Sequence, residues 1–257
     1  MQKDFIKEYW EHQGKTYQDS HWASWGDNWI IDLEIENISS YIEDGYNVLD
    51  MGCGNGYSTF KQYEKHNLKN IIGVDFAENM ITTANENLKK HNFNNMRFEQ
   101  GDVRQINFSD ETFDLVYATR LIINLPTWQE QQKAISECLR VTKKDGIVIL
   151  SEGFWEPLML LNSFRLLCGL EPLVEHDFNR YLKKTKLEAF IAELGYNYEI
   201  NDFSSIYYLG SRLLRELVTD HENYEGFSNP INKIFADIQK NYKGGGFGVQ
   251  QAFIIRK

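Results

Sequence analysis

The order of apolar and polar positions between residues 46 and 152 predicts strands and helices in regular alternation. Short apolar runs bounded by turn residues are typical of strands that are buried on both faces of a sheet. Such runs lie at 46–51, 70–75, 95–100, 113–118 and 147–152. Apolar residues recur at helical spacing over 57–66, 77–91 and 127–141, and a turn is expected at 143–146. Repeated strand–helix units predict a parallel sheet with helices on both faces.

The apolar pattern changes after Glu152, where the regular alternation stops. Residues 155–195 are rich in Leu and Phe and are expected to be mostly helical. Beyond them the pattern predicts a strand, two helices and a final strand, at 197–208, 211–219, 230–241 and 247–256. A glycine run at 244–246 predicts a hinge before the last strand. We therefore expect an α/β fold with a seven-stranded, mostly parallel sheet and a helical insertion before the last strands.

Aromatic residues are crowded ahead of the first predicted strand. They predict an N-terminal aromatic flap over a ligand site, although extra core is the simpler alternative. The aromatic side chains concerned are Tyr9, Trp10, Tyr17, Trp22 and Trp25. The expected organisation is an N-terminal flap and helix (1–45), a ligand-binding core (46–152), and a helical elaboration with the final strands (153–257) that holds an acceptor pocket or dimer contacts.

Composition and charge narrow the class of ligand. Acidic residues outnumber basic ones by 37 to 27, and the net charge of −10 disfavours nucleic acid as a partner. The cysteines, Cys53, Cys138 and Cys168, lack zinc or disulfide spacing, which favours a reducing cytoplasm and no metal. The first residues lack a signal peptide's apolar stretch, and the apolar run at 157–170 is too short to cross a membrane. We expect a cytoplasmic protein that binds neither nucleic acid nor membrane.

A glycine-rich turn after the first predicted strand carries the main chemical signal. In the sequence VLDMGCGNGYS, Gly52, Gly54 and Gly56 let the backbone approach a ligand closely because no side chain intervenes. Asp75 ends the second strand, where a carboxylate can accept from both hydroxyls of a ribose. A dinucleotide-binding turn carries a third glycine three residues after the second, but that position is Tyr57. The spacing therefore suits a nucleoside with an ammonium and a sulfonium better than one with a pyrophosphate.

Four segments resemble the motifs of class I (Rossmann-like) S-adenosylmethionine-dependent methyltransferases. They are the turn VLDMGCGNG, Asp75 in the sequence GVDF, the sequence Gly101-Asp102-Val103, and the fourth strand at 113–118. The resemblance covers residues 46–152, and the final predicted strand is compatible with it. It implies a Rossmann-like fold and in-line SN2 transfer of a methyl group from S-adenosyl-L-methionine to a small-molecule acceptor, with S-adenosyl-L-homocysteine as product.

The resemblance also implies roles for single residues around the cofactor. Gly52, Cys53 and Gly54 would line its methionine moiety, and Asp50 would lie near the amino group. Asp75 would hold the ribose hydroxyls.

On the adenine side, Phe76 would pack on the ring, Asp102 would accept from the amino group, and the Val103 N–H would donate to the ring. Taken alone, Asp102 is as easily a turn residue after a strand, and Phe76 a core residue. The remaining positions expected at the cofactor are Thr119 after the fourth strand and Tyr17 and Trp22 in the flap.

Methyl transfer from a sulfonium depends mainly on alignment of the reacting atoms, which supplies about 7–11 kcal/mol of barrier reduction. A general base helps when the acceptor is a hydroxyl. Arg120 is a candidate clamp for an acceptor carboxylate or phosphate, or else forms a structural salt bridge. Glu152 and His21 are candidate bases, although Glu152 more simply hydrogen-bonds a loop and a lone histidine is more often structural. His176 with Asp177 is a second candidate base pair.

Missing motifs argue against a nucleobase acceptor. Enzymes that methylate exocyclic base amines usually carry an Asn/Asp-Pro-Pro-Tyr run after the fourth strand, where this chain has Ala-Thr-Arg-Leu at 118–121. We expect oxygen methylation of a small polar metabolite, with nitrogen methylation of an amine as the alternative. A nicotinamide-dependent oxidoreductase and a non-catalytic cofactor-binding partner are the alternatives from other classes. A homodimer is a further possibility.

Overall fold

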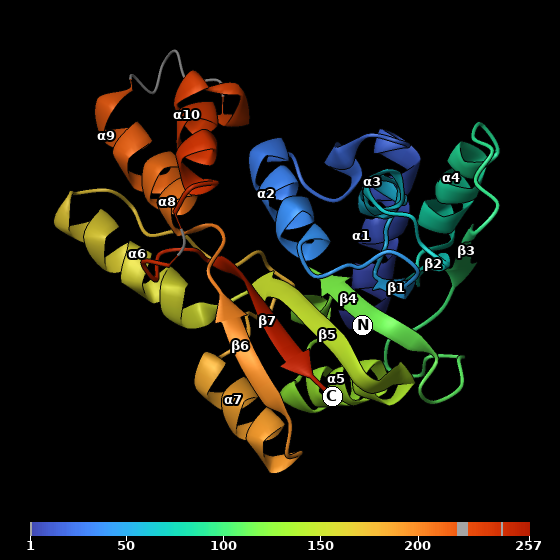
Figure 1. Cartoon of the computed structure of the whole chain (residues 1–257). Helices are drawn as coiled ribbons and strands as arrows, with labels where there is room; N and C mark the ends of the chain where they lie inside the picture. The colour runs from blue at the N-terminus through green and yellow to red at the C-terminus, as the bar shows by residue number, and fades with distance from the viewer. Residues whose placement is uncertain (1, 220–225, 243) are drawn as a thin grey trace.

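The computed structural model describes residues 2–219, 226–242 and 244–257, which fold around one sheet (Figure 1). Within these ranges, seven strands pair in the order β3-β2-β1-β4-β5-β7-β6. The strands are β1 (Asn47–Met51), β2 (Asn70–Asp75), β3 (Met96–Gln100), β4 (Phe113–Thr119), β5 (Thr142–Gly153), β6 (Asn197–Asn201) and β7 (Gln250–Arg256). Strands β1 to β5 are parallel, and β7 is antiparallel to its neighbours β5 and β6. The Rossmann-like, mostly parallel sheet expected from the sequence is confirmed.

Helices cover both faces of this sheet. The α-helices in the described ranges are α1 (Gln2–Tyr17), α2 (Asn28–Ser39), α3 (Tyr57–Lys65), α4 (Glu78–Leu88), α5 (Trp128–Val141), α6 (Trp155–Leu167), α7 (Lys184–Glu193), α8 (Ser205–Leu209), α9 (Arg215–Val218) and α10 (Pro230–Gln239). Short helical turns are η1 (His21–Ala23), η2 (Ile122–Asn124), η3 (Gly210–Leu214) and η5 (Gly226–Ser228). Helices α5 and α7 share a core with one face, and α2 packs on the other (Figure 1). Neighbouring β1 residues, Val48 and Leu49, are fully buried on opposite faces, which explains the unbroken apolar runs.

The turn expected at 143–146 is wrong, because these residues lie inside β5. Asp145 donates its N–H to the Lys257 carbonyl at 2.9 Å, and Lys257 donates to the Gly146 carbonyl at 3.0 Å. The end of the chain therefore extends the strand through residues that the local pattern reads as a turn.

The strand expected at 197–208 is too long, because β6 ends at Asn201. The next residues turn into α8. Its N–H groups at Ile206 and Tyr207 both donate to the side-chain oxygen of Gln239, at 2.6 and 3.1 Å. This cap comes from α10, so no local sequence pattern could have revealed it.

Residues 155–195 contain less helix than expected, since 168–183 form a non-helical connection between α6 and α7. Asn162 of α6 holds this connection by two hydrogen bonds of 2.8 Å to the backbone of Leu173. The connection then carries residues 174–181 to the carboxyl edge of the sheet, where they line the main cavity of the protein.

The N-terminal segment is a helix docked on α4. The Glu11 carboxylate accepts the N–H groups of Glu78 and Asn79, both at 2.8 Å, and so caps the first turn of α4. The helices meet closely at Gly14, where a Cβ would lie 3.1 Å from the Met80 nitrogen and make a tight contact. Helix α2, which also lies within residues 1–45, contributes to the central core.

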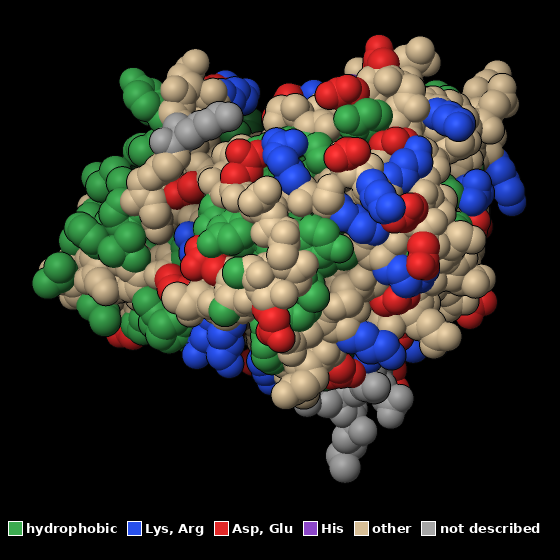
Figure 2. Space-filling model, turned by 60° about the horizontal axis from the view of Figure 1, so that its bottom comes forward, with side chains coloured by type: hydrophobic (Ala, Val, Ile, Leu, Met, Phe, Trp, Pro, Cys, Tyr) green, Lys and Arg blue, Asp and Glu red, His purple; other side chains and the backbone are tan. Residues whose placement is uncertain are grey.

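Exposed apolar side chains gather on α6 and α9 and belong to the green area at the left of Figure 2. The most exposed of them are Leu166, Leu167, Leu217 and Val218. No helix in the part of the chain that the structure describes is long and apolar enough to cross a membrane. The homodimer stays a prediction.

Candidate active site

Two adjoining cavities lie at the carboxyl ends of the parallel strands, where ligands of such sheets bind. The first, here called the narrow pocket, is lined by residues at or just after the ends of β1, β2 and β3, by the loop after β4, and by Ile6 of α1. The second, here called the aromatic chamber, has a volume of about 510 Å³. That volume is typical of a small-molecule site. The two share five lining residues, so together they offer one continuous site: Gly52, Asp75, Phe76, Leu121 and Asn124.

The glycine-rich turn forms the boundary between the two cavities. The φ angles of Gly52, Gly54 and Gly56 are +76°, +55° and +84°, in the left-handed region that favours glycine. A Cβ at Gly52 would lie 3.0 Å from the Cβ of Leu121, so a side chain there would close the gap between the turn and the loop after β4. The sequence thus produces a bare backbone edge against which a ligand can lie.

Asp75 ties this turn to the end of β2. One of its oxygens accepts the Gly54 N–H and the other accepts the Ala77 N–H, both at 2.9 Å. Burial raises the pKa of Asp75 to about 6, against the lowering effect of these N–H donors. Each oxygen keeps a further lone pair, and the side chain lines both cavities, so the arrangement fits the predicted grip on two ribose hydroxyls.

Asp50 lies behind the turn and is fully buried, and its place near the methionine amino group stays a prediction. One carboxylate oxygen accepts from the hydroxyls of Thr59 and Tyr117 at 2.6 and 2.7 Å. The other has no hydrogen-bond partner within the described residues. Burial raises the pKa of Asp50 to about 7. Its observed role is to join β1, β4 and α3 beneath the site.

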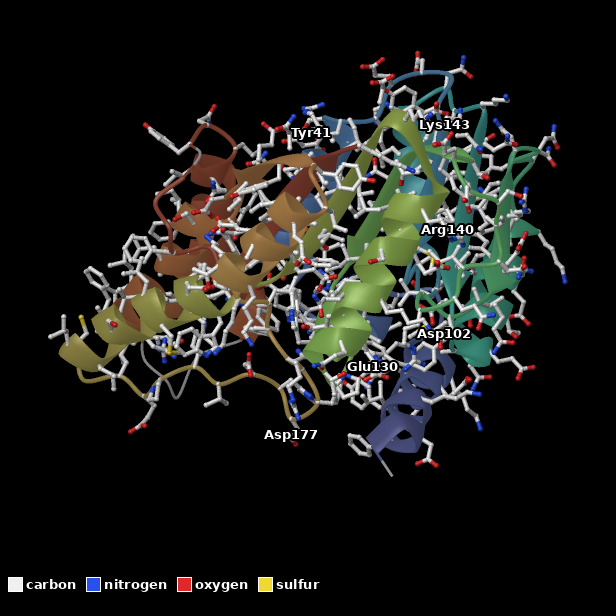
Figure 3. All side chains as sticks on the ribbon, turned by 90° about the horizontal axis from the view of Figure 1, so that it is seen from below. Tyr41, Asp102, Glu130, Arg140, Lys143 and Asp177 are labelled. Atoms are coloured by element: carbon white, nitrogen blue, oxygen red, sulfur yellow. The ribbon has the colours of Figure 1, made fainter. Side chains whose placement is uncertain are left out.

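The expected adenine residues come together in the narrow pocket. Phe76, Asp102 and Val103 all line it. The Asp102 carboxylate is held at its rim by the Arg104 guanidinium, which also pairs with Glu130 at 2.8 Å. Figure 3 shows Asp102 and Glu130 beside α1. An adenine amino group at Asp102 would therefore share a carboxylate that Arg104 already engages.

The aromatic flap divides into two parts. Tyr9, Trp10 and Trp25 line the aromatic chamber, as a flap over the site would. Tyr17 and Trp22 do not line either cavity; they are 40% and 49% exposed and stack on each other at 6.4 Å. Neither side chain is therefore placed to contact a ligand in these two cavities.

Of the two histidines expected as candidate bases, one lines the aromatic chamber and the other does not. His21 packs beside Trp22 and the Tyr57 ring and does not line either cavity, which argues against its predicted role as a base. His176 lines the chamber, with its ring 4.5 Å from that of Phe178. Asp177 lines it too, but no hydrogen bond joins the two residues in the described chain.

Arg120 lines the chamber and forms the structural salt bridge expected as the alternative to an acceptor clamp, with a partner that was not predicted. Its guanidinium donates to Glu34 of α2 at 2.7 Å and lies 5.1 Å from the Trp25 ring centroid. Glu34 is only 1% exposed and also accepts from Ser151 and Gln250, at 2.6 and 2.9 Å. The signal for Glu34 was its place in the apolar face of α2, where a buried acid requires a partner. Arg120 is thus charge-neutralised.

Glu152 does not line either cavity and is fully buried. Its carboxylate accepts from the N–H groups of Leu121, Ile122 and Ile123, at 3.1, 2.9 and 3.4 Å. Burial raises its pKa to about 8. The geometry therefore supports the simpler alternative, in which Glu152 holds the loop after β4, and gives no support to its role as a base.

Charge at the site disfavours a pyrophosphate. Of the described residues that line the two cavities, the only Lys or Arg side chains are Arg104 and Arg120, and both are ion-paired. Cys53 and Thr119 line the chamber at the positions expected for the cofactor's methionine end. The described residues contain no cluster of His, Cys, Asp or Glu suited to a metal ion.

Comparison with known proteins shows the family to which the chain belongs. A family model described as "Methyltransferase domain" matches residues 42–186. An uncharacterized methyltransferase of Schizosaccharomyces pombe is 32% identical over 44% of this chain and 42% of its own length. The demethylmenaquinone methyltransferase of Alkalihalophilus pseudofirmus is 31% identical over 43% and 46%, so the match spans less than half of both relatives.

A solved structure extends the likeness to the fold. Haemonchus contortus phosphoethanolamine N-methyltransferase 2, in complex with S-adenosyl-L-methionine, aligns with a TM-score of 0.58 and 17% identity. The alignment covers 89% of this chain and 52% of that one. With the glycine-rich turn, the Asp75 carboxylate and the strand order in agreement, the chain belongs to the methyltransferase-domain family, among the class I S-adenosylmethionine-dependent methyltransferases.

Proposed function

We propose that the protein transfers a methyl group from S-adenosyl-L-methionine to a hydroxyl oxygen of a compact, uncharged acceptor in the aromatic chamber. The observation that carries this proposal is the continuity of the two cavities across Gly52. A nucleoside held in the narrow pocket would direct its methionine end past the glycine-rich turn into the chamber. Residues 46–152 would then hold the cofactor, and residues from 1–45 and 153–257 would complete the acceptor side.

The residues around the narrow pocket suit the adenosine part of the cofactor. Phe76 and Val103 provide an apolar slot for adenine, and Asp75 offers acceptors to the ribose. Gly52 and Gly54 leave room for the methionine moiety. When bound, S-adenosyl-L-methionine supplies a methyl group on a positively charged sulfur. The protein's task is then to orient the acceptor and to keep water away.

The chamber wall suits an uncharged acceptor. Aromatic side chains contribute much of its surface: Tyr9, Trp10, Trp25, Phe178, Tyr181 and Tyr208. The charge of Arg120 is balanced by Glu34, so the chamber offers no uncompensated guanidinium to a carboxylate or phosphate. His176 is the histidine that lines it and is our candidate for the base that takes the hydroxyl proton.

Nitrogen methylation is the second candidate function. Glu175 and Asp177 line the same wall as His176 and would attract a protonated amine. An amine also needs less help from a base, because its lone pair becomes available in solution as it loses a proton.

The test uses the purified full chain with labelled S-adenosyl-L-methionine and matched panels of aromatic alcohols, phenols and amines. We expect methylated oxygen in the product, identified by its carbon-13 shift. His176→Gln should lower the rate roughly 100- to 10,000-fold. His21→Gln is the matched control and should leave it unchanged. Absence of cofactor binding would sink the proposal, and methylated nitrogen with an unaffected His176→Gln rate would support the second candidate.

A further inference from the structure

Three polar side chains at one end of the chamber carry atoms without a hydrogen bond in the described chain. They are Tyr181, Tyr208 of α8 and Gln250 of β7, and all three line the chamber. Tyr208 is 5% exposed and Gln250 is 3% exposed. Neither tyrosine hydroxyl is hydrogen-bonded within the described chain, although the backbone N–H of both residues is. Because these side chains line the cavity, their free atoms are available to a ligand as hydrogen-bond donors and acceptors.

The three side chains adjoin one another. A Cβ at Gly153 would lie 2.9 Å from the Tyr181 ring, and Gly153 pairs with Gln250 across β5 and β7. Burial holds the pKa of Tyr208 well above its usual value. The Arg212 guanidinium, 5.5 Å from the ring centroid, acts to lower this pKa, and the neighbouring Tyr181 acts to raise it. Both phenols are therefore neutral donors and acceptors at the same end of the chamber.

Gln250 is oriented by the buried acid of α2. Its side-chain nitrogen donates to Glu34 at 2.9 Å, which leaves its oxygen as the atom without a partner. Glu34 in turn balances Arg120, so neither charge of this pair is left for a ligand. The Glu175 carboxylate, which accepts the Tyr181 N–H at 2.9 Å, is a further charge near these groups and disfavours a carboxylate there. The phenols and the amide themselves suit an uncharged oxygen.

The strand order gives the distance from the reacting end. Gln250 opens β7, which is two strands from β4 in the order β1-β4-β5-β7. Neighbouring strands lie about 4.8 Å apart, so Gln250 lies roughly 10 Å from the end of β4, where Thr119 faces the chamber. A molecule that reaches both places is about as long as two fused rings.

We propose that Tyr181, Tyr208 and Gln250 form a subsite for a second, uncharged oxygen of the acceptor, a hydroxyl or a carbonyl. The inference rests on the proposed function and narrows its substrate class to bicyclic or similarly long compounds with oxygen at both ends. One oxygen receives the methyl group, and the other is held by this subsite.

The experiment measures binding of two probes to the full chain loaded with S-adenosyl-L-homocysteine. The probes are a naphthalenediol with hydroxyls at opposite ends and the naphthol that lacks one of them. Wild-type protein should bind the diol about three- to tenfold more tightly, the usual effect of one neutral hydrogen bond. Tyr208→Phe should abolish this preference and leave the melting temperature unchanged, because its hydroxyl has no partner in the protein.

Tyr207→Phe is the matched control on the same helix. The Tyr207 hydroxyl donates to Asp27 at 2.6 Å and does not line the chamber. This variant should therefore lose stability and keep the preference for the diol. Equal affinity for both probes in the wild type, or an unchanged preference in Tyr208→Phe, would overturn the subsite. Failure of the proposed function would appear differently, as a protein that prefers the diol but methylates no hydroxyl.

Discussion

Replacement of Asp75 by alanine tests the cofactor site most directly. Its two oxygens already accept from Gly54 and Ala77 at 2.9 Å, which leaves one lone pair on each for a ribose hydroxyl. A hydrogen bond to a charged group contributes about 1.5–3 kcal/mol. Loss of even one such bond should weaken the binding of S-adenosyl-L-homocysteine by roughly 10- to 150-fold. Since burial raises the Asp75 pKa to about 6, wild-type affinity should also fall as the pH drops below that value.

The assay is calorimetry with two ligands, S-adenosyl-L-homocysteine and an analogue without the ribose hydroxyls. The wild type should prefer the natural ligand, and Asp75→Ala should bind both equally. This comparison separates loss of the ribose contact from a general disturbance of the turn, which would weaken both ligands alike. Asp44→Ala is the control, because Asp44 accepts the Asn67 N–H at 2.9 Å and lines neither cavity. If Asp75→Ala keeps the wild-type preference for the hydroxylated ligand, Asp75 does not bind the ribose hydroxyls.

Three further variants test the structure around the site. Gly52→Ala should lose cofactor binding by calorimetry, whereas Gly45→Ala, with φ of +84° but open space around it, should lose only about 1–2 kcal/mol of stability and still bind. Burial raises the pKa of Glu152 from 4.5 to about 8, so its contribution to stability is complete below pH 4.5 and disappears as the pH rises through 8. In urea unfolding, the free energy of unfolding of Glu152→Gln should decline less over this range than that of the wild type. Arg120→Ala should cost about 3–5 kcal/mol by leaving Glu34 buried without its partner, and a second change, Glu34→Gln, should restore part of that loss in a double-mutant cycle.

The sequence predicts the parallel part of the sheet well because each strand carries its own signal. The strands β1 and β2 are apolar on both faces and end at residues with a recognisable chemical role, the glycine-rich turn and Asp75. Local pattern fails where a distant segment decides the structure. The Gln239 cap converts a strand-like run into α8, and Lys257 extends β5 through an apparent turn.

The cofactor side and the acceptor side of the proposed site also differ in how far the local sequence predicts them. The cofactor side follows directly after consecutive strands, so spacing along the chain identifies Gly52, Asp75 and Val103. The acceptor side is assembled from helices, connections and strands far apart in the sequence. Nothing in the local environment of Tyr208 or Gln250 marks them as partners, and only the folded chain brings them together.

Helix α1 forms part of the wall of the narrow pocket and is itself held in place by α4. Ile6 borders the narrow pocket, and the same helix is fastened to α4 through Glu11 and the close contact at Gly14. In the proposed function the spent nucleoside leaves this pocket after each turnover, and α1 forms part of the pocket wall. The contacts at Glu11 and Gly14 would then bear on the rate of nucleoside exchange.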